Sequence, residues 1–294
     1  MRLLATMAAS AALSTLATSA ALADPSGYIG LRGGLDNLEW SFEGDSETAE
    51  GSALQFLASG VYMFTPVLGV QGDVRAAVRS YEQGPATVDV ESFDGAVHGF
   101  YREEDYFLVG GFFQFGSDKL TEDGLTGDIE TSRRYAGAEA QLYLGNVTLY
   151  GQAGLQQSDI EQSLLSVGMS GWFGSVEARY FLTPDFRIDA HAGASAYDLD
   201  YIFTSGTVTT LNVGVGAEYK VENLPVSLFA TYDLYSTTAE YDLGPDDSPT
   251  LDEHRFLVGV KFAIGEDSLL DRDRSGASLK PVEGTFPVFT TPAP

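Results

Sequence analysis

The stretch HRFLVGVKFAIG, residues 254–265, alternates between two kinds of side chain. One set of alternating positions is apolar and comprises Phe256, Val258, Val260, Phe262 and Ile264. The other set includes Arg255, Gly259, Lys261 and Ala263. Because successive side chains of a strand point in opposite directions, this stretch predicts a β-strand with one face that avoids water and one that does not. A further 29 residues of different character follow it.

The chain begins with the features of a secretory signal peptide. A single Arg2 precedes an apolar run of small and branched residues, and Ala21-Leu22-Ala23 forms an A-x-A cleavage site before Asp24. We therefore expect residues 1–23 to be removed on export and exclude them from the fold.

Composition excludes several classes of protein. The formal net charge is −26, whereas binding to nucleic-acid phosphates needs clustered Lys and Arg, so no nucleic-acid partner is expected. The chain contains no Cys, so packing and backbone hydrogen bonds must hold the exported protein together. No run after residue 23 approaches 18 apolar residues, which argues against a membrane-spanning helix. An exported chain can also cross a membrane as a closed barrel, in which every backbone group is paired.

About twelve strand-like segments lie between Gly, Pro, Asn and Asp residues. Most are longer than the five or six residues of a typical globular strand and suit the roughly 9 to 11 tilted residues that cross a bilayer. Their approximate limits are 27–41, 52–64, 69–82, 89–101, 105–116, 129–144, 147–157, 165–181, 185–198, 206–220, 225–237 and 253–265.

The links between these segments alternate in length. Short links (TPVLG, REED, GN, TPD and ENLP) follow the even segments, and longer acidic links follow odd ones, as at 43–51, 117–128 and 238–253. Short turns at one end and long loops at the other are typical of an all-β, antiparallel up-and-down transmembrane β-barrel with both termini on the short-turn side.

An aromatic residue recurs near the end of each even segment, at intervals of 37 to 43 residues. Such rings settle at the lipid headgroups, so they predict an aromatic girdle. Tyr143 is expected to point inward instead, because Leu142 and Leu144 on either side of it face outward. A period near 40 is also the blade length of a β-propeller, which stays as the alternative fold although only two long strands occur per repeat. The six aromatics are Tyr62, Tyr101, Tyr143, Tyr180, Tyr219 and Phe262.

Charged side chains fall on the strand faces opposite the apolar ones. Because Lys or Arg on the lipid face near the midplane costs about 2 to 4 kcal/mol, this segregation predicts that the charges line the lumen. Acidic and basic residues are nearly balanced there, and many inward positions are Gly or Ala, which leaves space. The predicted lumen-lining residues are Asp73, Arg75, Arg79, Glu139, Glu177, Arg179, Arg187, Asp189, His191, Glu218, Lys220, Asp233 and Lys261.

The export signal, hairpin repeat, girdle and alternation together resemble a Gram-negative outer-membrane β-barrel protein over residues 27–265. The resemblance implies an outer-membrane location with periplasmic termini, and membrane lipid, lipopolysaccharide and the barrel-insertion machinery as partners. In that family the chain usually ends on an aromatic that the insertion machinery reads. Phe262 matches this aromatic, but the chain runs on for 32 residues.

Residues 266–294 are rich in Asp, Arg, Ser, Pro and Thr, so the sequence predicts a flexible periplasmic extension. Asp271, Asp273, Ser275 and Gly276 resemble the start of a calcium loop. Its twelfth position is Val282 instead of an acidic residue, so no metal site is predicted.

No arrangement of residues indicates catalysis, and we predict no enzyme and no cofactor. Asp189, His191 and Ser195 share an inward face, but His191 and Ser195 are about 13 Å apart on a strand at roughly 3.3 Å per residue. His254 lies at the rim beside Asp252 and Glu253, where a barrel hydrolase would keep its base. A solvated loop histidine explains it as well.

The predicted function is a narrow passive diffusion channel, similar to a porin. Side chains fill the interior of an eight-stranded barrel, whereas a sixteen-stranded barrel encloses a water channel. A barrel of about twelve strands is intermediate, so a narrow pore is possible. Acidic mouths would favour neutral or cationic solutes. The alternative is a sealed barrel that acts through its acidic loops, and a rim hydrolase is a third hypothesis. The sequence leaves the solute and the oligomeric state open.

Overall fold

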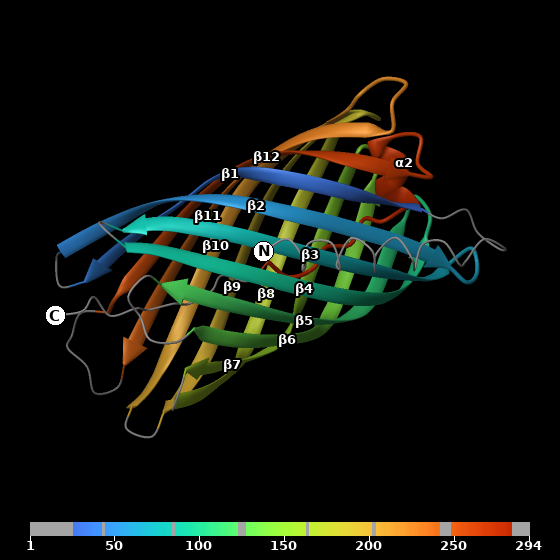
Figure 1. Ribbon diagram of the computed structural model, residues 1–294. Coiled ribbons are helices and arrows are strands. Elements are labelled where there is room, and N and C mark those ends of the chain that lie inside the picture. The colour runs from blue at the N-terminus through green and yellow to red at the C-terminus, as the bar shows by residue number, and fades with distance from the viewer. Residues whose placement is uncertain are drawn as a thin grey trace.

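The computed structural model describes residues 26–42, 45–83, 86–122, 128–162, 165–201, 204–241 and 248–283. Twelve antiparallel strands form one closed sheet, and a short helix follows the last strand (Figure 1). The predicted signal peptide, residues 1–23, lies outside the described residues. The elements are β1 (Ser26–Phe42), β2 (Asp45–Met63), β3 (Leu68–Gln83), β4 (Ala86–Glu103), β5 (Phe107–Glu122), β6 (Ile129–Leu144), β7 (Val147–Gln162), β8 (Leu165–Thr183), β9 (Phe186–Tyr201), β10 (Thr204–Lys220), β11 (Val226–Tyr241), β12 (Thr250–Ile264) and α2 (Leu269–Arg274).

The first and last strands close the barrel. β1 pairs with β12 from Gly27 opposite Ile264 to Ser41 opposite Thr250, and every other strand pairs with its neighbours in the sequence. The predicted up-and-down barrel is thus confirmed. Propeller blades would be separate sheets, so the alternative fold was wrong.

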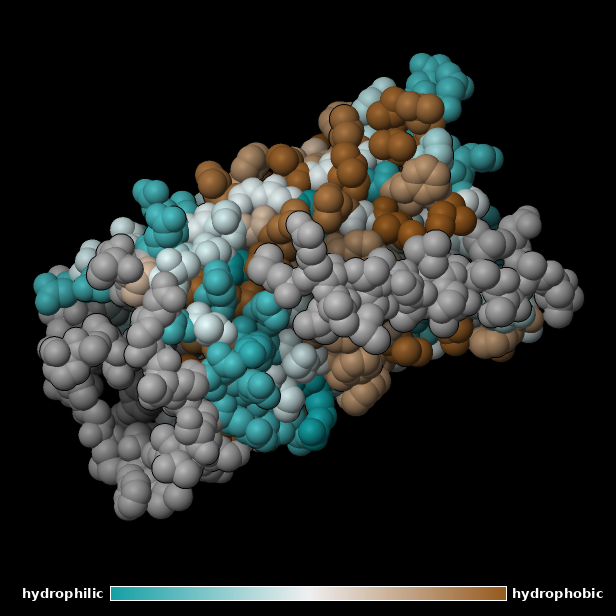
Figure 2. Space-filling view, viewed as in Figure 1, coloured by the Kyte–Doolittle hydropathy of each residue, from teal (hydrophilic) through white to brown (hydrophobic). Residues whose placement is uncertain are grey.

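The two faces of β12 differ as the alternation predicts. Phe256 and Val258 are 47% and 51% exposed on the outer face, whereas Arg255 and Leu257 are 3% and 0% exposed on the inner face. Exposed apolar side chains of this kind recur on all the strands and belong in contact with lipid. Figure 2 shows apolar side chains gathered towards the end that carries α2, which we call the α2 end, and hydrophilic side chains towards the opposite, far end.

The girdle residues lie near the α2 end of their strands. Tyr101, Tyr180, Tyr219 and Phe262 are between 37% and 52% exposed, and Tyr62 is half-buried. Tyr143 points inward and is 4% exposed, because the alternation puts Leu142 and Leu144 outside.

The long acidic links are largely paired strand. β1 and β2 continue until only residues 43–44 separate them, so the expected loop at 43–51 was mostly wrong. β5 reaches Glu122, so residues 117–122 of the expected loop at 117–128 are strand as well, and residues 123–127 lie outside the described residues. These extensions form because they have a small apolar core of their own. Ala49, Tyr81, Val90 and Leu120 pack together inside the barrel there. Their acidic residues therefore stand on strands that rise beyond the roughly 9 to 11 residues a bilayer needs.

Residues 266–283, which we call the C-terminal segment, turn back into the barrel. Gly265 takes a left-handed conformation (φ 80°), and the Ser268 side chain then caps α2 by accepting from the Asp271 amide at 3.0 Å. Burial raises the pKa of Glu266, whose carboxylate accepts a hydrogen bond from the Ser26 hydroxyl. Residues 266–283 are therefore not the flexible extension that the sequence predicts for residues 266–294, and residues 284–294 lie outside the described residues. In the part of the chain that the structure describes, no helix is both long and apolar enough to span a membrane.

Candidate functional site

The structure places twelve of the thirteen predicted lumen residues on the interior wall. Nine of the twelve are below 9% exposed, and Asp189, His191 and Lys261 line interior cavities. Lys220 shares their face of β10 but lies at the strand end, where it is half-buried. The interior is also where the C-terminal segment makes its contacts.

Glu218 on β10 holds three cations from three elements. Its carboxylate accepts from Arg187 at 3.2 Å, from Lys261 at 2.8 Å and from Arg272 of the C-terminal segment at 2.6 Å. The Ser227 hydroxyl donates to it as well, at 2.6 Å. Glu218 is 1% exposed, so this single buried carboxylate joins the strands to the segment.

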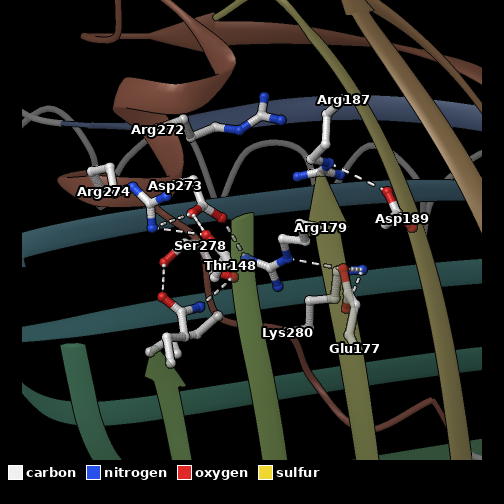
Figure 3. A network of polar contacts seen from close by, with 12 residues as sticks. Thr148, Glu177, Arg179, Arg187, Asp189, Arg272, Asp273, Arg274, Ser278 and Lys280 are labelled. Carbon is white, nitrogen blue, oxygen red and sulfur yellow. Dashed lines mark hydrogen bonds and ion pairs between the residues drawn. The ribbon is translucent and has the colours of Figure 1, made fainter. Parts of the chain in front are cut away.

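A second ion-pair cluster lies beside it (Figure 3). Arg179 on β8 donates to Glu177 at 2.9 Å and to Asp273 of the segment at 2.8 Å. Lys280, further along the segment, lies 2.8 Å from Glu177. The series Lys280, Glu177, Arg179 and Asp273 therefore alternates in the sign of its charge. Arg274 donates to the Thr148 hydroxyl at 2.8 Å. Asp273 and Arg274, placed on a flexible tail by the sequence, thus have partners on β7 and β8.

Wall glutamines bind the backbone of the C-terminal segment. Gln71 donates to the Leu279 carbonyl at 2.8 Å and accepts from its amide at 3.1 Å. Gln114 makes the same pair with Val282, at 2.9 and 2.7 Å. Gln141 donates to the Ser278 carbonyl at 3.2 Å. These amides satisfy backbone groups that a buried chain would otherwise leave unpaired.

Two apolar contacts add to this polar docking. Leu279 is 1% exposed and packs with Phe100, Leu108 and Tyr150, whereas Val282 packs with Phe112 on the inner wall. Full burial of one such side chain is worth about 1.5 to 3 kcal/mol. The segment is therefore held by complementary chemistry along its length and is a part of the lumen.

The inward end of the segment reaches another set of charges. Glu283 lies 3.0 Å from Arg32 and 3.5 Å from Arg75, and the Tyr235 hydroxyl donates to it at 3.2 Å. The interior also holds buried charged residues that the sequence analysis did not assign to the lumen. The inward charges absent from the sequence-based list include Asp36, Asp94, His98, Arg102, Asp118, Arg133, Glu253 and Arg255.

These additional inward charges follow the same alternation along their strands as the predicted lumen-lining residues. Asp94 accepts from Arg75 at 2.8 Å and from Arg133 at 3.1 Å. His98 lies between two carboxylates, 3.1 Å from Asp73 and 2.8 Å from Glu139. Extending the period-two assignment over the full length of each strand is the signal that would have found them.

Three cavities adjoin one another beside the C-terminal segment. They leave about 30, 100 and 130 Å³ for the centres of water molecules. The smallest and the middle cavity share Arg187 and Lys261, and the middle and the largest share Thr231 and Glu283. Since one water needs about 10–15 Å³ by this measure, the largest holds about ten waters. The cavities thus follow the segment from the α2 end into the middle of the lumen.

The residues considered for catalysis do not assemble into a catalytic set. His191 lies 3.1 Å from Asp233 instead of meeting Ser195. His254 points outward, where its Nδ1 is 2.9 Å from the Tyr232 hydroxyl, whereas Glu253 is buried inside. Within the described ranges, no three His, Cys, Asp or Glu side chains gather as a metal site.

The comparisons with known proteins agree with this architecture. The family model of the outer membrane protein beta-barrel domain matches residues 6–142. No curated protein matches the sequence.

Two solved structures are similar in fold. The translocator domain of the autotransporter NalP from Neisseria meningitidis has 14% identity and a TM-score of 0.52, over 88% of this chain and 94% of that one. An outer membrane channel from Pseudomonas putida F1 has 12% identity and a TM-score of 0.53, over 84% of this chain and 98% of that one. The family match over residues 6–142, together with the closed barrel and its apolar outer face, makes the chain similar to outer-membrane β-barrel proteins.

Proposed function

We propose that the protein is a narrow passive diffusion channel for small solutes, with the α2 end facing the periplasm after removal of the signal peptide. The row of adjoining cavities between the C-terminal segment and the barrel wall, lined by strands β1 to β3 and β6 to β12, carries this proposal. The segment binds glutamines of β3, β5 and β6 and side chains of β7, β8 and β10, and the cavities are the lumen space that these contacts leave. The similar channel from Pseudomonas putida F1 adds support from fold alone.

The cavity walls suit polar solutes of small size. Aromatic rings such as Tyr197 and Phe173 alternate there with Asn212, Thr210 and other groups that can hydrogen-bond. Acidic side chains at the mouth of a pore favour cations over anions there. Exposed acids such as Glu47 stand on the strand extensions, whereas the interior carries paired charges of both signs.

A sealed barrel is the second proposal. The observation that favours it is the number of wall charges that find a partner in the interior, including those of Arg179 and Glu218 with the C-terminal segment. Such a barrel would act through its outer surface and would pass no solute.

Replacing Thr231 by Trp is expected to lower solute permeation by roughly an order of magnitude. Thr231 lines both larger cavities, and an indole ring there would displace most of the water that they hold. The measurement is the swelling rate of liposomes that contain the mature protein, in a series of neutral solutes of increasing size. Val258→Trp is the matched control because Val258 faces lipid and is 51% exposed.

Permeation by the unchanged protein and by Val258→Trp, but not by Thr231→Trp, would support the channel. Swelling no faster than in protein-free liposomes, from protein confirmed as folded, would instead reject the channel and favour the sealed barrel.

A further inference from the structure

The smallest of the three cavities has a wall of unusual charge for so acidic a protein. Five cationic side chains line it and only one carboxylate, Asp273, does so. Three of the cations come from the barrel wall and two from the C-terminal segment. The five are Arg179, Arg187, Lys261, Arg272 and Lys280.

The carboxylates next to this cavity are already engaged. Glu218 binds Arg187, Lys261 and Arg272, and Glu177 binds Arg179 and Lys280. Asp189 lies 3.3 Å from Arg187, and Asp273 binds Arg179. Four carboxylates therefore face five cations, and Arg274 adds a further positive charge 3.4 Å from Asp273.

In the described part of the chain, three guanidinium groups at the cavity have donors without a hydrogen-bond partner, and only that of Arg187, its Nε, lies within ion-pair distance of a carboxylate, 3.3 Å from Asp189. Among the described residues, Nη2 of Arg179 and Nη1 of Arg272 have no hydrogen-bond partner, although the two residues are only 1% and 4% exposed. Arg179 lies over the ring of Tyr150 and Arg272 over that of Tyr28, but a ring face is a poorer acceptor than an anionic oxygen. A buried charged donor without an acceptor is costly, so the site is suited to a ligand that supplies oxygen atoms.

We propose that this cavity binds a small oxyanion, a phosphate or a carboxylate group, between Arg179 and Arg272. Arg forks match such groups well. The cavity leaves space for two or three water molecules, and it adjoins the 100 Å³ cavity, with which it shares the lining residues Arg187 and Lys261. The oxyanion can therefore be a free ion or the head group of a larger solute. Figure 3 shows Arg272 and Lys280 of the segment on the same side of the wall as Arg179 and Arg187.

Binding at this site goes beyond the proposed channel, because it needs no passage of solute through the lumen. An oxyanion there bridges the wall and the C-terminal segment, since Arg179 belongs to β8 and Arg272 to α2. Bound anion is thus expected to hold the segment in the barrel.

The test is isothermal titration of inorganic phosphate into the folded mature protein in zwitterionic detergent at pH 7. Saturable binding at one site is expected. Arg272→Gln and Lys280→Gln should each weaken it by roughly tenfold, because each removes one charged donor. Lys119→Gln removes the same charge from the exposed outer face, where Lys119 pairs with Asp128, and should leave the affinity unchanged.

Lys280→Gln also guards against misfolding, because the Lys280 side chain is 41% exposed and tolerates the change better than the buried Arg272. Glycerol phosphate distinguishes the two sources of oxyanion. If glycerol phosphate competes with inorganic phosphate, the site accepts the head group of a larger solute. If it does not compete, the site accepts only the free ion. No saturable binding of phosphate, or equal weakening by Lys119→Gln, would overturn the proposal.

Discussion

Truncation after Gly265 is expected to raise the single-channel conductance roughly fivefold or more, because a barrel of twelve strands has room for water once nothing occupies its lumen. The C-terminal segment accounts for most of that occupation. Leu279 and Val282 are anchored to the wall by paired hydrogen bonds from Gln71 and Gln114. The barrel itself closes between β1 and β12, so the truncated chain keeps all twelve strands.

Adding the missing piece back is the control for this experiment. A synthetic peptide of residues 266–283 applied to the α2 side should restore the low conductance of the full chain. A peptide of scrambled sequence has the same charge and length and should not. Equal conductance of the truncated and complete proteins would show that the segment does not obstruct the lumen.

Replacing Glu218 by Gln is expected to lower the free energy of unfolding by about 3 to 5 kcal/mol, because removing one partner of a buried ion pair leaves the other charge uncompensated. Here one carboxylate serves Arg187, Lys261 and Arg272, all within 3.2 Å. Urea titration of the protein in detergent, followed by intrinsic fluorescence, measures the change.

Glu240→Gln is the matched control. Glu240 is an exposed carboxylate at the far end of β11, and surface changes of this kind are usually within about 0.5 kcal/mol. Similar stability of the two variants would mean that Glu218 does not organise the surrounding cations.

The spanning parts of the barrel could be predicted because their signal is local. Residues 129–144 are predicted as a strand and form β6 with the same bounds. In β12 the alternation of Phe256 and Val258 with Arg255 and Leu257 gives both the strand and the direction of its two faces. Contact with lipid on one face of each strand imposes this alternation. The spanning strands can therefore be predicted from a single sequence.

The strand extensions were missed for a physical reason. Outside the bilayer no lipid selects apolar outward residues, so acidic segments such as Asp45–Glu50 lose the pattern although they remain paired. Inward residues of these extensions include Ala49, whose small side chain gives only a weak signal of a buried strand face in the sequence.

The C-terminal segment was missed because its partners are distant in the sequence. Leu279 is 208 residues from Gln71, and Asp273 is 94 residues from Arg179. By composition alone Asp, Arg and Ser predict disorder in water. In a lumen lined by charges of both signs, the same residues are complementary partners, and only the assembled barrel reveals this.

The docking of the C-terminal segment in the lumen is tested most directly by comparing the accessibility of two of its positions. The native chain has no Cys, so Ser275→Cys and Ser278→Cys each introduce a single thiol. Ser275 is exposed at the end of α2, whereas Ser278, three residues later, is 7% exposed and bonded to Gln141. We predict that a maleimide carrying polyethylene glycol labels Ser275→Cys in the folded protein and labels Ser278→Cys only after unfolding. Rapid labelling of both positions in the folded protein would contradict the docking of this segment in the lumen.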